Sequence, residues 1–249
     1  MDAAVRQVRV IRYGGWAEYK RDLFPELFES DRFRPDRYLF RGSGDANWTL
    51  SSSFDRRYAQ LPLDRRLALW DELIAEFRQG CADLGVPGSE LDEDRKLWAL
   101  GRHHGLPTRL LDWSTSPYVA AFFAFHDHLL RPSPGYDQVA VWALHLQNPV
   151  WCREYGVEIV SAPSFQNIRL RSQGGKFTLC RAPFAGLEDY VERFATEVAL
   201  TQCVLPATDA EHALADLDAM GINSYTLFPD LAGLAQMATM RASLRVMMV

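Results

Sequence analysis

The stretch GRHHGLPTRLLDWSTSP, residues 101–117, joins the end of one helix to the start of another. Its Gly-Leu-Pro element ends a helix predicted over residues 92–104, because glycine and proline both interrupt helices. Its closing Ser-Pro pair opens a helix predicted over residues 117–128, because serine caps helices and proline fits the first turn. The leucines and the tryptophan between them carry too much apolar area to leave in water. We therefore expect residues 103–113 to form a buried segment that contributes to a site.

Helices and strands are interleaved irregularly around this stretch, without the regular alternation of a parallel βαβ fold. The helix over residues 117–128 is apolar nearly all round, which is typical of a buried helix. The sequence therefore predicts an α+β domain. Further helices are expected over residues 16–28, 64–79, 208–220 and 230–243, and strands over residues 37–41, 138–146, 176–180 and 198–205.

Local signals set several of these boundaries. Gly80 is expected to end the helix over residues 64–79, because glycine is a common helix stop. Thr208 and Glu211 have the spacing of a capping box, which predicts the start of a helix. Residues 225–228 are expected to be short and extended.

The length of 249 residues, with 48% hydrophobic and 24% charged residues, is ordinary for a globular protein. We expect a single domain over residues 1–249, with residues 1–36 as an N-terminal helical extension and residues 37–249 as the core. The longest unbroken apolar run, residues 118–125, is much shorter than the ~20 residues that cross a bilayer. The N-terminus lacks the apolar stretch of a signal peptide, so we expect a cytoplasmic protein without a membrane partner.

The net charge of −5 argues against nucleic-acid binding over the whole surface, while a local basic cleft is compatible with it. The four cysteines are widely spaced and form no CxxC pair, so a thiolate zinc site is not expected. No third histidine or carboxylate stands at metal-ligand spacing, and neither a GxSxG nor a GxxxxGK motif occurs. The sequence therefore disfavours metallohydrolases, serine hydrolases and P-loop proteins, and we expect no metal.

Arg41 is the first candidate for ligand binding. It stands at the end of a predicted strand and is followed by Gly42 and Gly44. Glycines let the backbone approach a ligand, and a guanidinium forms paired, charge-assisted hydrogen bonds with anions. The alternative is that Arg41 serves only in a structural salt bridge.

The second candidate segment is residues 101–117, in which Asp112 could orient a histidine or a substrate hydroxyl. The alternative for Asp112 is a buried ion pair with Arg109. His103 and His104 cannot both face one site if they are helical, so at least one of them is structural. Ser116 serves as the helix cap, whereas Ser114 and Thr115 precede the cap and are freer to face a cleft.

The sequence resembles the FRG domain family, which is named for a Phe-Arg-Gly tripeptide, here residues 40–42. The family's His-x-Gly-Leu-Pro-Thr-Arg-Leu-Leu-Asp-Trp pattern is similar to residues 103–113, and its small apolar helix to residues 117–125. A later Arg-x-x-x-Gln-x-Gly-x-Phe pattern is similar to residues 169–177, with one extra residue. The family tail is similar to residues 221–223 and 227–231.

A more distant resemblance is to the ADP-ribosyltransferase superfamily of Arg-Ser-Glu type. Those proteins carry an aromatic-Arg-Gly strand, then a Ser-Thr-Ser strand leading into an Ala-rich helix, and last a catalytic glutamate. Arg41, residues 114–116 and residues 120–124 occur here in that order. The resemblance implies a split, antiparallel-rich sheet with flanking helices that binds NAD, as substrate, in a cleft.

The resemblance also implies roles for single residues. In this family a carboxylate stabilises the positive charge that develops on the ribose when the nicotinamide bond breaks. The position of that glutamate is matched by Gln173, which has no charge, so Glu158, Glu197 or Asp112 are the possible substitutes. The implied catalytic residues are Arg41, Ser114, Gln173 and Asp112, and the implied NAD contacts are Arg41, Gly42, Ser43, His104, Thr108, Arg109 and Thr115.

Three functions follow as hypotheses. The first is transfer of ADP-ribose to a macromolecule, or hydrolysis of NAD, in a toxin or phage-defence role that the resemblance implies. The second is a binding module that recognises NAD, a related nucleotide or a partner protein without catalysis. The third is a nuclease-like effector that uses His103, His104 and Asp112. The sequence leaves the acceptor and the oligomeric state open.

Overall fold

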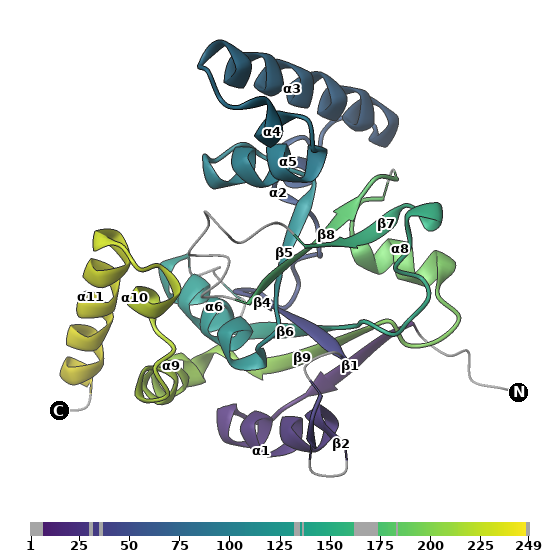
Figure 1. Ribbon diagram of the computed structural model, residues 1–249. Coiled ribbons are helices and arrows are strands. Elements are labelled where there is room, and N and C mark those ends of the chain that lie inside the picture. The colour runs from purple at the N-terminus through teal and green to yellow at the C-terminus, as the bar shows by residue number, and fades with distance from the viewer. Residues whose placement is uncertain are drawn as a thin grey trace, which may run out of the picture.

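The computed structural model describes residues 7–29, 32–34, 37–131, 135, 137–161, 174–182 and 184–247. Within these residues the centre of the fold is a seven-stranded sheet in the order β1-β9-β6-β4-β5-β8-β7 (Figure 1). Its neighbours pair antiparallel, except for β1 and β9, which are parallel. The strands of this sheet are β1 (Val8–Arg12), β4 (Tyr38–Ser43), β5 (Leu110–Ser114), β6 (Gln138–His145), β7 (Val157–Val160), β8 (Gly175–Cys180) and β9 (Leu200–Pro206); β2 (Phe28–Glu29) and β3 (Arg32–Phe33) form a separate hairpin.

Helices cover both faces of the sheet, and one group of them forms a separate layer beside β5, β8 and β7 (Figure 1). The expected α+β class, with an antiparallel-rich sheet and flanking helices, is confirmed. The helices are α1 (Trp16–Leu27), α2 (Ser53–Arg57), α3 (Leu63–Asp83), α4 (Gly88–Leu91), α5 (Asp94–His103), α6 (Pro117–Leu130), α8 (Leu187–Phe194), α9 (Ala210–Ala219), α10 (Ser224–Leu227) and α11 (Leu231–Met247), with short 3₁₀ turns at Arg153–Tyr155 and Ala207–Asp209.

The sheet is divided between β4 and β5. These strands share a single Cα pair, Phe40 with Ser114, whereas β4 pairs with β6 through six residues and β5 with β8 through five. Beyond that pair the two strands separate. The sheet therefore consists of two halves that meet at one point, and the residues next to this point, Arg41 on β4 and Asp112 on β5, lie at the opening.

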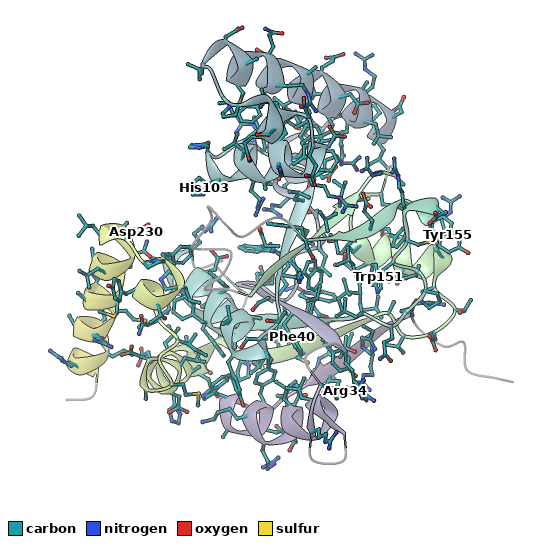
Figure 2. All side chains as sticks on the ribbon, viewed as in Figure 1. Arg34, Phe40, His103, Trp151, Tyr155 and Asp230 are labelled. Carbon is teal, nitrogen blue, oxygen red and sulfur yellow. The ribbon has the colours of Figure 1, made fainter. Side chains whose placement is uncertain are left out.

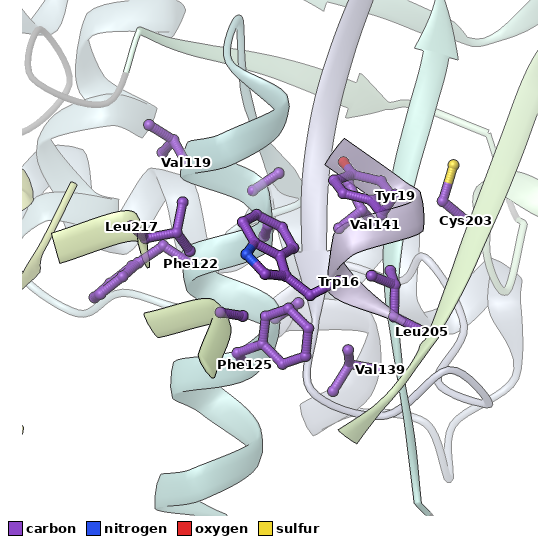
Figure 3. Close-up of a cluster of buried hydrophobic side chains, with 14 of the residues drawn as sticks. Trp16, Tyr19, Val119, Phe122, Phe125, Val139, Val141, Cys203, Leu205 and Leu217 are labelled. Carbon is purple, nitrogen blue, oxygen red and sulfur yellow. The ribbon is translucent and has the colours of Figure 1, made fainter. Parts of the chain in front are cut away.

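The alternation of side chains along the strands distributes the core over three clusters. Phe40 packs with α1, α6 and α9 on one face of the sheet, around Trp16 and Phe125 (Figure 3). The preceding Leu39 points to the other face, where α8 covers β4, β5, β6 and β9. Leu110 on β5 belongs to the third cluster, in which α2, α3 and α5 pack on β5, β7 and β8.

The N-terminal residues contribute to the main sheet and its core. β1 is an edge strand that pairs with β9, and Trp16 and Tyr19 on α1 are fully buried. The helical extension expected over residues 1–36 therefore includes a strand of the sheet, and its helix packs in the core.

Most of the expected elements are confirmed, including α1, α5, α6 with its Ser116 cap, β6, β8 and β9. Two helix boundaries are wrong. α3 continues through Gly80 to Asp83. The capping box at Thr208 does not form, because residues 207–209 make a 3₁₀ turn and the N-cap of α9 is Asp209. The Asp209 carboxylate instead accepts a hydrogen bond of 2.7 Å from the backbone N of Trp16.

The segment expected to be extended over residues 225–228 is largely helical, because α10 covers Ser224–Leu227. Its capping box is formed by Asn223 and Thr226. The Asn223 side chain accepts from Thr226 N at 3.0 Å, and the Thr226 hydroxyl oxygen accepts from Asn223 N at 3.1 Å. Two backbone donors at the start of this short helix are thus satisfied by side chains.

Gly42 is the point at which α6 packs against β4. A Cβ atom at this position would lie 2.0 Å from the carbonyl oxygen of Ala120 and 2.5 Å from the backbone N of Ala124. Only a glycine allows the helix backbone to come this close to the strand. The third residue of the Phe-Arg-Gly tripeptide therefore serves helix packing.

We expect Gly42→Ala to lower the free energy of unfolding by about 2–3 kcal/mol, because the added methyl group displaces backbone atoms in a packed core. Gly80→Ala is the matched control, since Gly80 lies inside α3 with nothing within 4 Å of its Cβ position. That substitution should stabilise the protein by about 0.5–1 kcal/mol. Urea unfolding of both variants checks the pair, and equal stabilities for Gly42→Ala and the wild type would contradict the packing argument.

Candidate functional site

Arg41 reaches across the opening between β4 and β5. Its Nη1 donates a hydrogen bond of 2.9 Å to the main-chain oxygen of Asp112, and the same atom lies 3.7 Å from the carboxylate Oδ2 of that residue. Since the strands have separated at this point, the guanidinium takes the place that a strand neighbour would otherwise fill. Its side chain is 23% exposed, so one side of it is open to solvent.

Arg102, in the last turn of α5, holds the Asp112 carboxylate from the other side. Its Nε donates to Oδ1 at 2.7 Å, and its Nη2 contacts Oδ2. Such a two-point pair fixes the plane of the carboxylate. Asp112 is thus engaged by Arg102 and Arg41, and its side chain is 41% exposed. The alternative of a buried pair between Asp112 and Arg109 is wrong.

Two further arginines complete a group that we call the arginine cluster: Arg41, Arg56, Arg102 and Arg131. Burial lowers the pKa of Arg41 to about 10; Asp112 opposes this shift, and the positive charges of Arg102 and Arg56 add to it. The pKa of Arg56 is likewise lowered by burial and then by the charges of Arg102 and Arg131. The charges act on one another although the four residues come from four different elements.

The carboxylates at the arginine cluster do not balance it. Asp112 is shared by Arg41 and Arg102, and Asp127 on α6 pairs with Arg131. Among the residues that the structure describes, four guanidinium groups against these two carboxylates leave two positive charges. An anion bound here would relieve the repulsion that lowers the pKa of Arg41 and Arg56.

Ser114 lies on the same face of β5 as Asp112, because residues two apart on a strand point to one side. Its Oγ accepts a hydrogen bond of 3.0 Å from Ser116 N, and the residue is 5% exposed. Thr115 is half-buried, and its backbone N donates to the oxygen of Gly174 at 3.2 Å. Gly174 directly follows Gln173, which lies outside the described residues. Arg41 and Asp112 are therefore brought into contact, and Ser114 lies two residues further along β5, in register with Phe40.

The glycines after Arg41 do not open space for a ligand, contrary to the sequence-based interpretation. The space beside Gly42 is filled by the backbone of α6. A Cβ atom on Gly44 would lie 2.9 Å from the backbone N of His128, at the end of the same helix. Ser43, a proposed NAD contact, donates its hydroxyl to the oxygen of Asp45 at 2.9 Å.

Thr108 and Arg109, also proposed as NAD contacts, are buried in the interior. Arg109 is 2% exposed; its Nη2 lies 3.5 Å from Oδ1 of Asp55 and donates to the oxygen of Ala182 at 3.0 Å. Thr108 is fully buried, and its backbone N donates to the Ser53 hydroxyl at 3.2 Å. These residues join α2 to the start of β5, so their observed contacts are structural, and their part in NAD binding stays a prediction.

The remaining candidates are at other places. His103 and His104 are exposed at the end of α5, with ring centroids 5.1 Å apart (Figure 2). Glu158 on the edge strand β7 pairs with Arg181 at 2.8 Å and Arg95 at 3.4 Å. Glu197 precedes β9, where its main-chain oxygen accepts from Asn148. Asp112 is thus the carboxylate that the structure places between Arg41 and Arg102.

The described part of the chain holds neither a cluster of metal-binding side chains nor a helix able to span a membrane. No three histidine, cysteine, aspartate or glutamate side chains in it gather as a metal site would require. None of its helices has both the length and the apolar composition to cross a bilayer.

Sequence reasoning missed Arg102 beside Asp112, and Arg56 and Arg131 as members of the arginine cluster. They lie on α5, α2 and at the end of α6, and only the fold brings them together. A local signal existed for Arg102 alone. It is ten residues before Asp112 in the segment already singled out, at a helix end from which a long side chain can reach the following strand.

Comparison with known proteins gives one match. Residues 36–131 match the model of the FRG domain, and this range contains the whole arginine cluster together with Asp112 and Ser114. The resemblance to that family is thereby confirmed over these residues. No curated protein and no solved structure matched the chain.

Proposed function

We propose that this chain, whose residues 36–131 match the FRG domain, binds NAD at Arg41 and Arg102 and breaks its nicotinamide–ribose bond, transferring ADP-ribose to a macromolecule or to water. The observation that carries the proposal is the position of Arg41, Asp112 and Ser114. Arg41 and Asp112 are in contact at the opening between β4 and β5, and Ser114 lies where these strands meet, in register with Phe40.

The arginines suit the pyrophosphate of NAD. Arg41 and Arg102 present guanidinium groups to the same carboxylate in the ligand-free protein, so both are already oriented towards one anionic group. Guanidinium forks bind phosphate oxygens in the same two-point manner as carboxylate oxygens. A pyrophosphate therefore competes with Asp112 for these donors and leaves the carboxylate free to face the ribose.

The chemistry follows from the charge on Asp112. When the C1′–N bond of the nicotinamide ribose breaks, the bonding electrons leave with nicotinamide and positive charge develops on the sugar. A carboxylate at the ribose stabilises that charge. The oxygen of water or of an acceptor then bonds to C1′ and releases its proton to solvent. We assign the charge to Asp112, the orientation of the ribose to Ser114, and a neutral hydrogen bond to a ribose hydroxyl to Gln173.

We expect Arg41→Ala to weaken NAD binding by about tenfold to a hundredfold, because a charge-assisted hydrogen bond to phosphate is lost. Calorimetric titration of NAD into the wild type and the variant measures the change. Arg153→Ala is the control, since Arg153 is exposed on a distant 3₁₀ turn and its loss should leave the affinity unchanged. Thermal melting shows that Arg41→Ala is folded, and Arg41→Lys, which keeps the charge without the fork, should bind with intermediate affinity. Equal binding by wild type and Arg41→Ala, or none by the wild type, contradicts the NAD proposal.

A second candidate function is NAD or nucleotide binding without turnover. It is favoured by one observation: the Ser114 hydroxyl is nearly buried and already accepts a hydrogen bond from Ser116 N. A site in this state binds the pyrophosphate but does not position the ribose. Release of nicotinamide from NAD, measured with a cell lysate as acceptor source, separates the two functions.

A further inference from the structure

The outer half of the arginine cluster has no part in the NAD proposal. Arg131 is 74% exposed at the C-terminal end of α6. Arg56 is exposed as a residue at the end of α2, although its guanidinium is partly shielded from water and its Nη1 donates to the main-chain oxygen of Ser51. By contrast Arg41 and Arg102 are 23% and 28% exposed and turn towards Asp112. The cluster thus has an inner pair and an outward-facing pair.

Further basic groups continue the outward-facing pair. Arg57 follows Arg56 on α2 and is exposed. His103 and His104 follow Arg102 at the exposed end of α5 (Figure 2). Basic side chains from three chain segments that are distant in sequence are therefore exposed at or next to the arginine cluster, and we call this set, centred on Arg56 and Arg131, the basic rim.

The electrostatics of the basic rim indicate a polyanion. Partial burial lowers the pKa of Arg56, and repulsion from Arg102 and Arg131 lowers it further, so like charges lie near one another here. The protein as a whole carries a net charge of −5, which repels polyanions from the rest of the surface and confines their attraction to this face. Separate, exposed guanidinium groups suit several phosphates in succession better than one compact anion.

We propose that the basic rim binds the phosphodiester backbone of a nucleic-acid strand, which makes nucleic acid the acceptor class for the ADP-ribose. The acceptor role rests on the proposed function, whereas the binding does not depend on NAD. An acidic peptide is the competing ligand. The acidic peptide is less well matched to exposed arginines. Each arginine–phosphate contact releases counterions from the densely charged nucleic-acid backbone, and this release contributes much of the binding free energy.

The test is fluorescence anisotropy with a labelled single-stranded oligodeoxynucleotide of mixed sequence, in the absence of NAD, over a series of salt concentrations. The double variant Arg56→Gln/Arg131→Gln should bind at least about tenfold more weakly at low salt. It should also reduce the slope of log affinity against log salt by about 1.4, since each phosphate contact on a single strand contributes about 0.7.

The matched control is Arg153→Gln/Arg193→Gln, which removes the same charge from exposed positions near the stacked rings of Tyr155 and Phe194. Tyr155 lies on the opposite side of the molecule from His103 (Figure 2). The control should bind the oligonucleotide as the wild type does. If the double rim variant melts at a lower temperature, Arg131→Gln alone replaces it, because Arg131 contacts only Asp127 in the described structure.

Three results would overturn the inference: no oligonucleotide binding by the wild type, equal losses in the rim and control variants, or displacement of the oligonucleotide by poly-glutamate at an equal concentration of charge. Calorimetry with NAD keeps this test separate from the proposed function. The rim variant should bind NAD within about threefold of the wild type, since a single charge-assisted contact would change the affinity by about tenfold or more. If Arg41→Ala loses NAD binding but still binds the oligonucleotide, the result supports nucleic-acid binding by the basic rim independently of NAD.

Discussion

Replacing Asp55 with alanine should lower the free energy of unfolding by about 3–5 kcal/mol, because it leaves the buried charge of Arg109 without its counter-charge. Asp55 is 4% exposed and Arg109 2% exposed. The Asp55 carboxylate lies 3.5 Å from Nη2 of Arg109 and accepts a hydrogen bond of 2.5 Å from the Ser52 hydroxyl. In the described structure Nε and Nη1 of Arg109 have no hydrogen-bond partner. The Asp55 carboxylate is therefore the main group that compensates the buried positive charge of Arg109.

A small cavity lies next to the pair of Asp55 and Arg109, and a water molecule in it could not replace the carboxylate that Asp55→Ala removes. The volume of the cavity is about 10 Å³, the room of a single water molecule, and its lining includes Arg109, Asp55 and Thr178. One water can satisfy a free N–H group of Arg109, but it cannot replace a charge. The double variant Asp55→Ala/Arg109→Met, which removes both charges, should therefore be more stable than Asp55→Ala alone.

Urea unfolding with linear extrapolation measures these differences. Asp94→Ala is the matched control, because Asp94 pairs with Arg78 at 2.6 Å on the surface, where an ion pair contributes less than about 1 kcal/mol. If Asp55→Ala lowered the free energy of unfolding by no more than Asp94→Ala does, the argument that Asp55 compensates the charge of Arg109 would be contradicted.

Local sequence signals predicted the elements whose formation is decided locally. α6 begins at a Ser-Pro pair and is apolar nearly all round, and both features are visible without the fold. β1 was missed because Val8–Arg12 is only half-buried at the sheet edge and its partner β9 is almost two hundred residues away. α10 was missed because its residues favour strands, while the capping pair of Asn223 and Thr226 decides the outcome.

The partner of Asp112 illustrates what sequence spacing leaves out. Arg109 is three residues away and looks like the natural partner. Arg109, however, lies just before β5 and turns to Asp55, whereas Asp112 lies within β5 and turns to the opening. The contacts with Arg41 and Arg102 depend on how α5, β4 and β5 pack, which no local pattern encodes.

Asp112→Asn should lower the rate of NAD cleavage by about a hundredfold to a thousandfold, because the amide keeps the shape and hydrogen-bond acceptor of the carboxylate but loses its charge. The substitution frees Arg41 and Arg102 from a competing anion, so NAD binding should stay equal or become tighter. Since Asp112 is 41% exposed, the free energy of unfolding should change by no more than about 1 kcal/mol. A fall in kcat without a rise in KM, at unchanged stability, separates a catalytic carboxylate from a structural one.

Gln173→Glu distinguishes the origin of the charge by the sign of its effect. If Asp112 supplies the charge, a second carboxylate near the ribose raises the pKa of one of the two and lowers the rate. If the site instead lacks a working carboxylate, the new glutamate supplies it with nearly unchanged shape, and the rate of nicotinamide release rises. We expect the decrease, because Asp112 stands between Arg41 and Arg102. An increase in Gln173→Glu, together with an unchanged rate in Asp112→Asn, would contradict the assignment of the charge to Asp112.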